Sequence, residues 1–404
     1  MKKLFRLFFL IFVLHPFASI AQLSHYVPTH YQGLFNMQPS SARATGMGLT
    51  TITLPGVENA FYNPATIGLV EEKVSVHLNY ASGSEVYRKG RFPFIGATYR
   101  INDKLIVGMS TFSWLDDKDS PWTTIIGIYN EPVDGRRSQS WYNFIAAYEI
   151  IPHLQFGVSG NYLVDSSVGA GTVTNSEFIL SAGAIYDRAV NFIKSDKVQR
   201  QNIRIAASLV NALMKNRIEQ TFEDNLNFRD LPIHLTFGTA YQVRLPFSPG
   251  FIEGRSFYKS MPRQVDLALH LQYRDVLKGP EDDVVNANHE FNSAFGIGAE
   301  AWFLDFATLR MGYYTEKRPS GRREDGGLWV TDTKRGFTWG FGAKLPLNEW
   351  TNKAFPFTTE VNLVTSTVLN EYANNGPTIE SYFDGRDFLF AIGVNLKLVN
   401  NSQP

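Results

Sequence analysis

Several stretches of the sequence alternate between large apolar residues and small or polar residues. Between residues 265 and 273, valine, leucine and tyrosine occupy every second position, and aspartate, alanine, histidine and glutamine occupy the positions between them. The pattern recurs at 233–243, 337–345 and 388–398. Side chains on a strand point alternately to its two faces, so each stretch has one apolar face. Strands of about nine to eleven residues cross a bilayer when tilted, whereas strands of soluble proteins average about five or six. The pattern therefore predicts a transmembrane barrel.

Counting such stretches predicts an all-β fold, a transmembrane antiparallel β-barrel of about fourteen strands. The three shortest links follow the second, fourth and tenth expected strands, and the links after odd strands are mostly long. Outer-membrane barrels have short periplasmic turns and longer outer loops, so this parity places both ends of the barrel in the periplasm. The expected strands lie near 74–81, 94–101, 104–114, 142–150, 154–164, 177–187, 202–211, 233–245, 264–274, 291–303, 307–315, 336–345, 357–365 and 388–398.

Composition and the absence of known motifs exclude several classes of protein. Lysine and arginine balance aspartate and glutamate at 38 each, so there is no basic field to bind nucleic acid. Zero cysteines exclude thiolate zinc sites, iron–sulfur clusters and disulfides. The sequence has no nucleophile elbow, zinc-protease motif or phosphate-binding loop. A lipid hydrolase in the lumen is the third alternative, but no serine nucleophile is identifiable beside a histidine. No catalytic residue, metal or cofactor is predicted.

The first 21 residues have the pattern of a cleavable export signal. Lys2, Lys3 and Arg6 precede an apolar run at 7–14, and Ser19-Ile20-Ala21 provides the small residues that signal peptidase requires. The apolar run is too short for a membrane-spanning helix. We therefore expect a mature chain that begins at Gln22. Together with the barrel pattern, this predicts a location in the outer membrane of a Gram-negative cell.

Residues 22–72 lack sustained alternation and are rich in small and turn-forming residues. Gly46 and Gly48 permit positive φ and a close approach of the backbone. Asn63 followed by Pro64 is typical of a helix N-cap and first helical position. The segment also carries apolar side chains that gain free energy on burial. We therefore expect a packed N-terminal hatch at 22–72 rather than a loose tail, followed by the barrel at 73–404.

The stretch Ala42-Arg43-Ala44-Thr45-Gly46-Met47-Gly48, followed about fifteen residues later by Asn63-Pro64-Ala65, resembles the N-terminal signature of the FadL-type outer-membrane transporter superfamily. The resemblance implies a fourteen-stranded barrel, plugged by an N-terminal hatch, that passes long-chain fatty acids or other hydrophobic compounds. The PorV/PorQ proteins of the type IX secretion system share the signature and serve protein export. The resemblance therefore implies either of these two functions.

Two hypotheses for the function remain open. The protein is either a channel for a hydrophobic small molecule or a membrane-held docking protein for secreted proteins and the secretion machinery; outer-membrane lipid is a partner in both cases. The ligand, the protein partner and the oligomeric state stay open. The hatch residues expected to meet the ligand or partner are Arg43, Gly46, Met47, Gly48, Phe61, Asn63 and Pro64. The polar residues expected to face the lumen are Arg204, His234, Arg244, Asp266, His270, Arg274, Lys344, Glu360 and Lys397.

Overall fold

The computed structural model describes most of the barrel and the segment that precedes it. The described ranges are 41–85, 88–116, 136–168, 172–212, 217–222, 225–230, 233–247, 262–278, 293–318, 330–345, 347, 357–374 and 385–398. The expected export signal, the mature start at Gln22 and the first part of the expected hatch lie outside these ranges.

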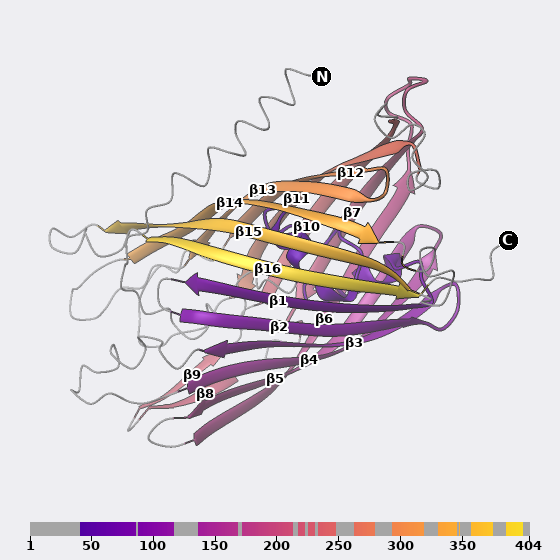
Figure 1. Ribbon diagram of the computed structural model, residues 1–404. Helices are drawn as coiled ribbons and strands as arrows, with labels where there is room; N and C mark the ends of the chain where they lie inside the picture. Colours follow the sequence, from indigo (N-terminus) through magenta and orange to yellow (C-terminus); the bar gives the residue numbers. More distant parts are fainter. Residues whose placement is uncertain are drawn as a thin grey trace.

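Fourteen antiparallel strands form a closed barrel in the order β1-β16-β15-β14-β13-β12-β11-β10-β7-β6-β5-β4-β3-β2 (Figure 1). The predicted fold class and strand number are confirmed. Between β7 and β10 the chain adds a separate two-stranded sheet, β8 (Arg217–Phe222) and β9 (Asn225–Asp230), in a stretch that was expected to be a link. The barrel strands are β1 Val74–Glu85, β2 Arg88–Arg100, β3 Leu105–Asp116, β4 Arg136–Ile151, β5 Leu154–Val168, β6 Thr172–Ala189, β7 Arg200–Val210, β10 Ile233–Pro246, β11 Gln264–Lys278, β12 Ala294–Phe303, β13 Ala307–Arg318, β14 Val330–Leu345, β15 Phe357–Asn374 and β16 Gly385–Leu398.

The two ends of the barrel differ in their connections. Tight turns join β2 to β3, β4 to β5 and β12 to β13, and we call this end the turn end. In the first of these turns, the Asn102 side chain accepts hydrogen bonds from the backbone N–H groups of Lys104 and Leu105, each at 2.9 Å. His153 and Leu304 adopt positive φ in the other two turns. The opposite end, where β1 joins β2 and β3 joins β4, is called the loop end.

Alternate side chains of β11 point to opposite faces of the wall. Leu267, Leu269 and Tyr273 are 41%, 46% and 45% exposed, whereas His270 and Gln272 are 0% and 4% exposed. The outward face is apolar, as a lipid-facing wall requires. No helix within the described residues is long and apolar enough to span a membrane.

The facing of β11 can be tested with introduced cysteines, because the chain has none of its own. We expect Leu269→Cys to react with a lipid-phase thiol probe and Ala268→Cys to be protected from it. We also expect Leu269→Arg to destabilise the barrel by about 2–4 kcal/mol if the residue lies near the bilayer midplane. Equal labelling at the two positions would contradict the assigned facing.

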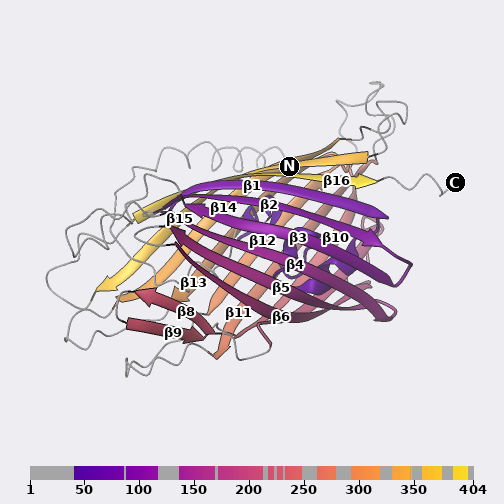
Figure 2. The same ribbon diagram turned by 90° about the horizontal axis from the view of Figure 1, so that it is seen from below.

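The segment before β1 lies inside the barrel, where Figures 1 and 2 both show it in indigo within the ring of strands. It contains the helix α3 (Ala42–Thr45) and the 3₁₀ helices η2 (Val57–Asn59) and η3 (Pro64–Leu69). Met47, Ile52 and Ile67 are each 0% exposed. We call residues 41–72 the internal segment; its apolar side chains lie against the inner face of the wall.

Candidate functional site

The first part of the internal segment is a short helix followed by a tight turn. Ser41 caps α3, since its hydroxyl accepts a hydrogen bond from the Ala44 N–H at 3.2 Å. The N–H of Ala42 donates to the Asn79 side chain on β1 at 3.0 Å. After the helix, the Gly48 N–H donates to the Thr338 hydroxyl on β14 at 2.8 Å. These bonds join the start of the segment to two separate strands of the wall.

Glycines in the internal segment and in the wall allow the turn at Met47 and Gly48 to pack directly against β12 and β13. Gly48 has φ +65°, and a Cβ there would lie 2.5 Å from the carbonyl oxygens of Ile297 and Tyr313. On the wall, a Cβ at Gly298 or Gly312 would overlap the backbone of the same turn. Glycine is therefore required here for positive φ and for close approach. Gly46 does not have the positive φ that was one of two expected reasons for glycine there, because it ends α3 with φ −66°; a Cβ at this position would lie 3.2 Å from a Val364 methyl carbon.

A second contact of this kind lies at the start of η3, against β5 and β6. Asn63 is the N-cap and Pro64 the first helical residue, as their pairing predicts. The Asn63 side chain accepts from the Ala65 N–H at 3.0 Å and donates to the Ile52 carbonyl at 3.1 Å. Side chains at Gly157 or Gly183 would overlap this cap. The internal segment is thus supported by strand pairs that are not neighbours in the barrel.

Inner-face side chains of β11 and β7 bind the backbone between these two contacts. The Gln272 amide oxygen accepts from the N–H groups of Thr51 and Ile52 at 2.7 and 3.1 Å. His270 Nδ1 and the Thr53 hydroxyl lie 2.9 Å apart. Arg204 donates to the Thr53 carbonyl at 2.7 Å and to the Asp187 carboxylate at 2.6 Å. Of the expected lumen residues, His270 and Arg204 therefore contact the internal segment.

A buried group of charges joins α3 to β12, β13 and β15. Arg43 and Arg310 both donate to the Glu300 carboxylate, at distances between 2.5 and 3.0 Å. Arg310 also reaches the Glu360 carboxylate at 3.5 Å. The side chains of Glu300 and Arg310 are 2% and 0% exposed. The two cations and two anions balance, and we call these four residues the charge network.

The charge network stabilises the ionised form of Arg43, whose side chain is only 16% exposed. Burial disfavours the charged guanidinium, but the nearby Glu300 and Glu360 carboxylates outweigh burial, so the pKa of Arg43 lies above its usual value. Arg43 and Glu360 were predicted from the sequence, but their partners Glu300 and Arg310 were not. The alternation could have found both, because each faces the lumen between outward apolar or small residues of an expected strand.

Several other expected lumen residues pair with opposite charges near the turn end. Arg244 pairs with Asp266 at 2.7 Å, and Lys344 pairs with Asp305 at 2.6 Å, both near the turn end. These side chains are between 28% and 41% exposed. Lys397 is also near the turn end, and it contacts the internal segment, since it lies 3.2 Å from the carboxylate of Glu72, the last residue of that segment. His234 and Arg274 are each 3% exposed and lie near the loop end of β10 and β11. Within the described ranges, no three histidine, aspartate or glutamate side chains are grouped as a metal site requires.

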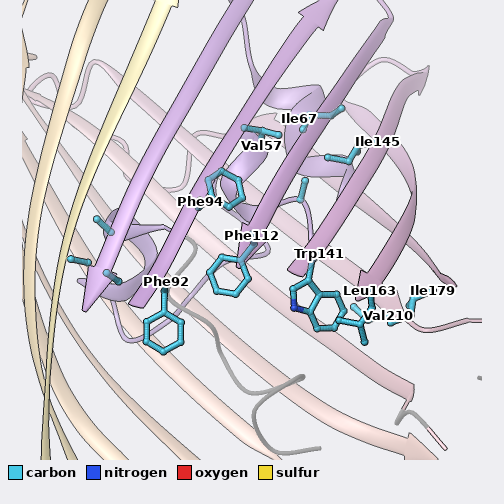
Figure 3. Packing of buried hydrophobic residues seen from close by; sticks show 14 of the residues in the cluster. Val57, Ile67, Phe92, Phe94, Phe112, Trp141, Ile145, Leu163, Ile179 and Val210 are labelled. Atoms are coloured by element: carbon cyan, nitrogen blue, oxygen red, sulfur yellow. The ribbon is translucent and has the colours of Figure 1, made fainter. Parts of the chain in front are cut away.

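A row of apolar side chains crosses the inner face of β2 to β7 on the loop-end side of the internal segment. Register places Phe112 opposite Trp141, and Trp141 opposite Leu163, on neighbouring strands. Figure 3 shows the resulting row of side chains across the inner wall. Phe61 of the internal segment contacts the row, with its ring centroid 4.9 Å from that of Trp141. We call the row the apolar belt; its members are Phe92, Phe112, Trp141, Leu163, Ile179 and Val210.

The apolar belt was missed because polar lumen residues were expected. Three of its six members follow or precede an outward aromatic residue, in Trp141-Tyr142, Tyr162-Leu163 and Phe178-Ile179. Such adjacent apolar residues obscure the two-residue period that was used to find strands. Indeed, the expected fourth strand began at 142, one residue after Trp141. Neighbouring strands with apolar residues on both faces were the signal that could have revealed the belt.

Comparisons with known proteins address the fold. No family model and no curated protein sequence matches the chain. Among solved structures, a FadL homologue from Pseudomonas aeruginosa matches with a TM-score of 0.51 and 10% identity, covering 93% of this chain and 99% of that one. The chain has a FadL-type fold.

Two further structures match this FadL-type fold more loosely. The Ralstonia pickettii toluene transporter TbuX has a TM-score of 0.48 and 12% identity, covering 90% of this chain and 100% of that one. The Pseudomonas putida toluene transporter TodX has a TM-score of 0.46 and 11% identity, covering 89% and 97%. In the FadL-type barrel described here, the apolar belt and the charge network occupy different sectors of the inner face.

Proposed function

We propose that the protein is an outer-membrane channel that binds a hydrophobic small molecule and passes it across the membrane. The observation that carries this proposal is the apolar belt, which faces the lumen beside Phe61. A wall that only needs to hydrate its interior has no reason to place aromatic residues there, since barrel lumens are ordinarily polar. Ligand sites, in contrast, are mostly apolar with a few polar groups.

The position of the apolar belt supports an order of events. On β5, Leu163 lies closer to the loop end than Gly157, where the internal segment contacts the wall; on β3, Phe112 lies closer to it than Gly108. If the loop end faces the outside of the cell, a ligand entering there reaches the belt before the internal segment. The internal segment then acts as the hatch, and its movement away from the wall opens the path.

The proposal is tested by removing one aromatic residue from the belt. In Trp141→Ala, the lost apolar contact is about 1.5–3 kcal/mol for a ligand that uses it, so we expect ligand affinity and uptake to fall about tenfold or more. The measurement is uptake of radiolabelled oleate and toluene by cells that carry the variant as their only such channel. A long-chain and a monoaromatic probe also distinguish the two ligand classes.

The control is Tyr142→Ala, which removes the neighbouring aromatic residue on the outward face. Tyr142 is 45% exposed, whereas Trp141 is 3% exposed. We expect the control to retain wild-type uptake. Wild-type uptake in Trp141→Ala would overturn the channel proposal. If the same variant instead stopped export of secreted proteins, the docking function would replace it.

A further inference from the structure

The link between β6 and β7, residues 190–199, lies on the outward face of the barrel wall. It is ordered around Gln201, whose side chain points outward from β7, and this residue is only 4% exposed. The Gln201 amide oxygen accepts from the N–H groups of Phe192 and Ile193 at 3.1 and 2.9 Å. Its amide nitrogen donates to the Ile193 carbonyl at 2.8 Å. These hydrogen bonds hold the link in a defined conformation.

Gln201 holds the link so that two apolar side chains project from it. Phe192 is 66% exposed and Ile193 is 47% exposed, although both are large and apolar. The Phe192 ring lies 6.1 Å from the ring of the outward-facing Tyr241. Ile205 lies four residues after Gln201 on β7 and is 53% exposed on the same outward face. The exposed side chains of the link therefore continue the lipid-facing surface at the turn end.

Basic residues accompany this apolar surface. Lys194 and Lys197 are exposed on the link, and Arg188 and Arg200 are exposed at the strand ends that it joins. Asp196 is the single acidic residue between positions 188 and 200. At a membrane surface, apolar acyl chains and headgroup phosphates lie next to each other. Such a surface can therefore contact the apolar and the basic side chains of the link at the same time.

We propose that the β6–β7 link is a binding site for an anionic phospholipid of the leaflet at the turn end. Phe192 and Ile193 enter the boundary between the acyl chains and the headgroups, and Lys194 and Lys197 bind the headgroup phosphate. Gln201 is the positioning residue, because its hydrogen bonds fix the backbone that carries the apolar pair and the two lysines. The site is on the outside of the wall and is separate from the lumen.

The test measures lipid affinity of the full-length protein in detergent by native mass spectrometry. The probes are phosphatidylglycerol and phosphatidylcholine. We expect phosphatidylglycerol to bind the wild type more tightly. In Lys194→Gln/Lys197→Gln its affinity should fall about 30-fold, at about 1 kcal/mol for each lysine near a membrane surface, and phosphatidylcholine binding should not change.

The matched control is Lys73→Gln/Lys104→Gln, which removes two lysines from the same end of the barrel but not from the link. It should keep wild-type affinity. Gln201→Leu keeps every basic residue but loses the hydrogen bonds that order the link, so it should also lose phosphatidylglycerol selectivity. Wild-type affinity in Lys194→Gln/Lys197→Gln, or an equal loss in the control, would overturn the proposal.

Two further measurements distinguish a lipid site from a site for free phosphate, and the link from the transport path. Inorganic phosphate at millimolar concentration should leave the lipid bound; displacement would overturn the lipid assignment, since the site would then select phosphate alone. Uptake of oleate and toluene should be unchanged in the lysine variant, because the link does not face the lumen. Failure of the lipid site therefore leaves the proposed channel function intact, and the reverse also holds.

Discussion

Replacing Gly48 with valine is expected to release the internal segment from an otherwise assembled barrel. Gly48 has φ +65°, and a Cβ would lie 2.5 Å from two carbonyl oxygens of β12 and β13. Positive φ costs a non-glycine residue about 1–3 kcal/mol, and the overlap adds to it because backbone atoms of the wall must move. We expect the substitution to destabilise the seated segment by at least about 3 kcal/mol in total, which lowers the ratio of seated to released segment by about 100-fold.

A cysteine at Thr51 reports the result, since Thr51 is 2% exposed in the seated segment. A water-soluble thiol reagent should label Thr51→Cys slowly alone and about 100-fold faster together with Gly48→Val. Unboiled electrophoresis verifies that the barrel is assembled. Gly46→Ala is the control: with φ −66° and its closest neighbour a Val364 methyl carbon at 3.2 Å, it should remain close to wild type. Protection of Thr51→Cys in the Gly48→Val protein would contradict the prediction.

Replacing Glu300 with glutamine is expected to destabilise the folded protein by about 3–5 kcal/mol, the cost of leaving a buried charge without its partner. Arg43 and Arg310 both donate to the Glu300 carboxylate, so the substitution leaves two guanidinium groups, 16% and 0% exposed, near a single remaining carboxylate, that of Glu360. The measurement is the free energy of unfolding from denaturant titration of the protein folded into phospholipid vesicles.

Two variants test whether the loss of the charge network causes this destabilisation. Asp266→Asn removes a carboxylate from the pair with Arg244, whose side chain is 35% exposed, and should cost about 1 kcal/mol or less. Adding Arg43→Met to Glu300→Gln removes one unpaired guanidinium and should recover part of the loss. If the double variant were as unstable as the sum of the two single variants, the charge network would not explain the effect.

The barrel could be predicted from the sequence because the bilayer imposes the two-residue period on each strand. All fourteen expected stretches overlap barrel strands, but the structure extends several strands toward the loop end. β6 begins at Thr172 instead of 177, and β15 ends at Asn374 instead of 365. These extensions are rich in threonine, serine and asparagine. Since they lack an apolar face, they carry no alternation of the kind that identified the rest.

The internal segment was harder to predict than the wall. The Asn63-Pro64 pair identified its cap because that signal is local, and the same holds for the glycine at position 48. The contacts of Glu300, Gln272 and Gly312 with the segment depend on the register of strands more than 200 residues away along the chain. No pattern within a short window contains that information. The apolar belt needs the same registers, since its residues come from six strands.

Closure of the wall depends on pairing between the two ends of the barrel sequence. The Ser75 hydroxyl donates to the Asn395 side chain, and this bond between β1 and β16 joins residues 320 positions apart. The internal segment is synthesised before every strand, yet β12, β13 and β14 near the end of the chain supply several of its contacts, including the ion pair of Arg43 with Glu300. The internal segment therefore has its full set of partners only when the strands that close the ring are also present. Such distant pairing is slow to form. A chain truncated before β12 would thus lose the partners of its own N-terminal segment as well as the ring.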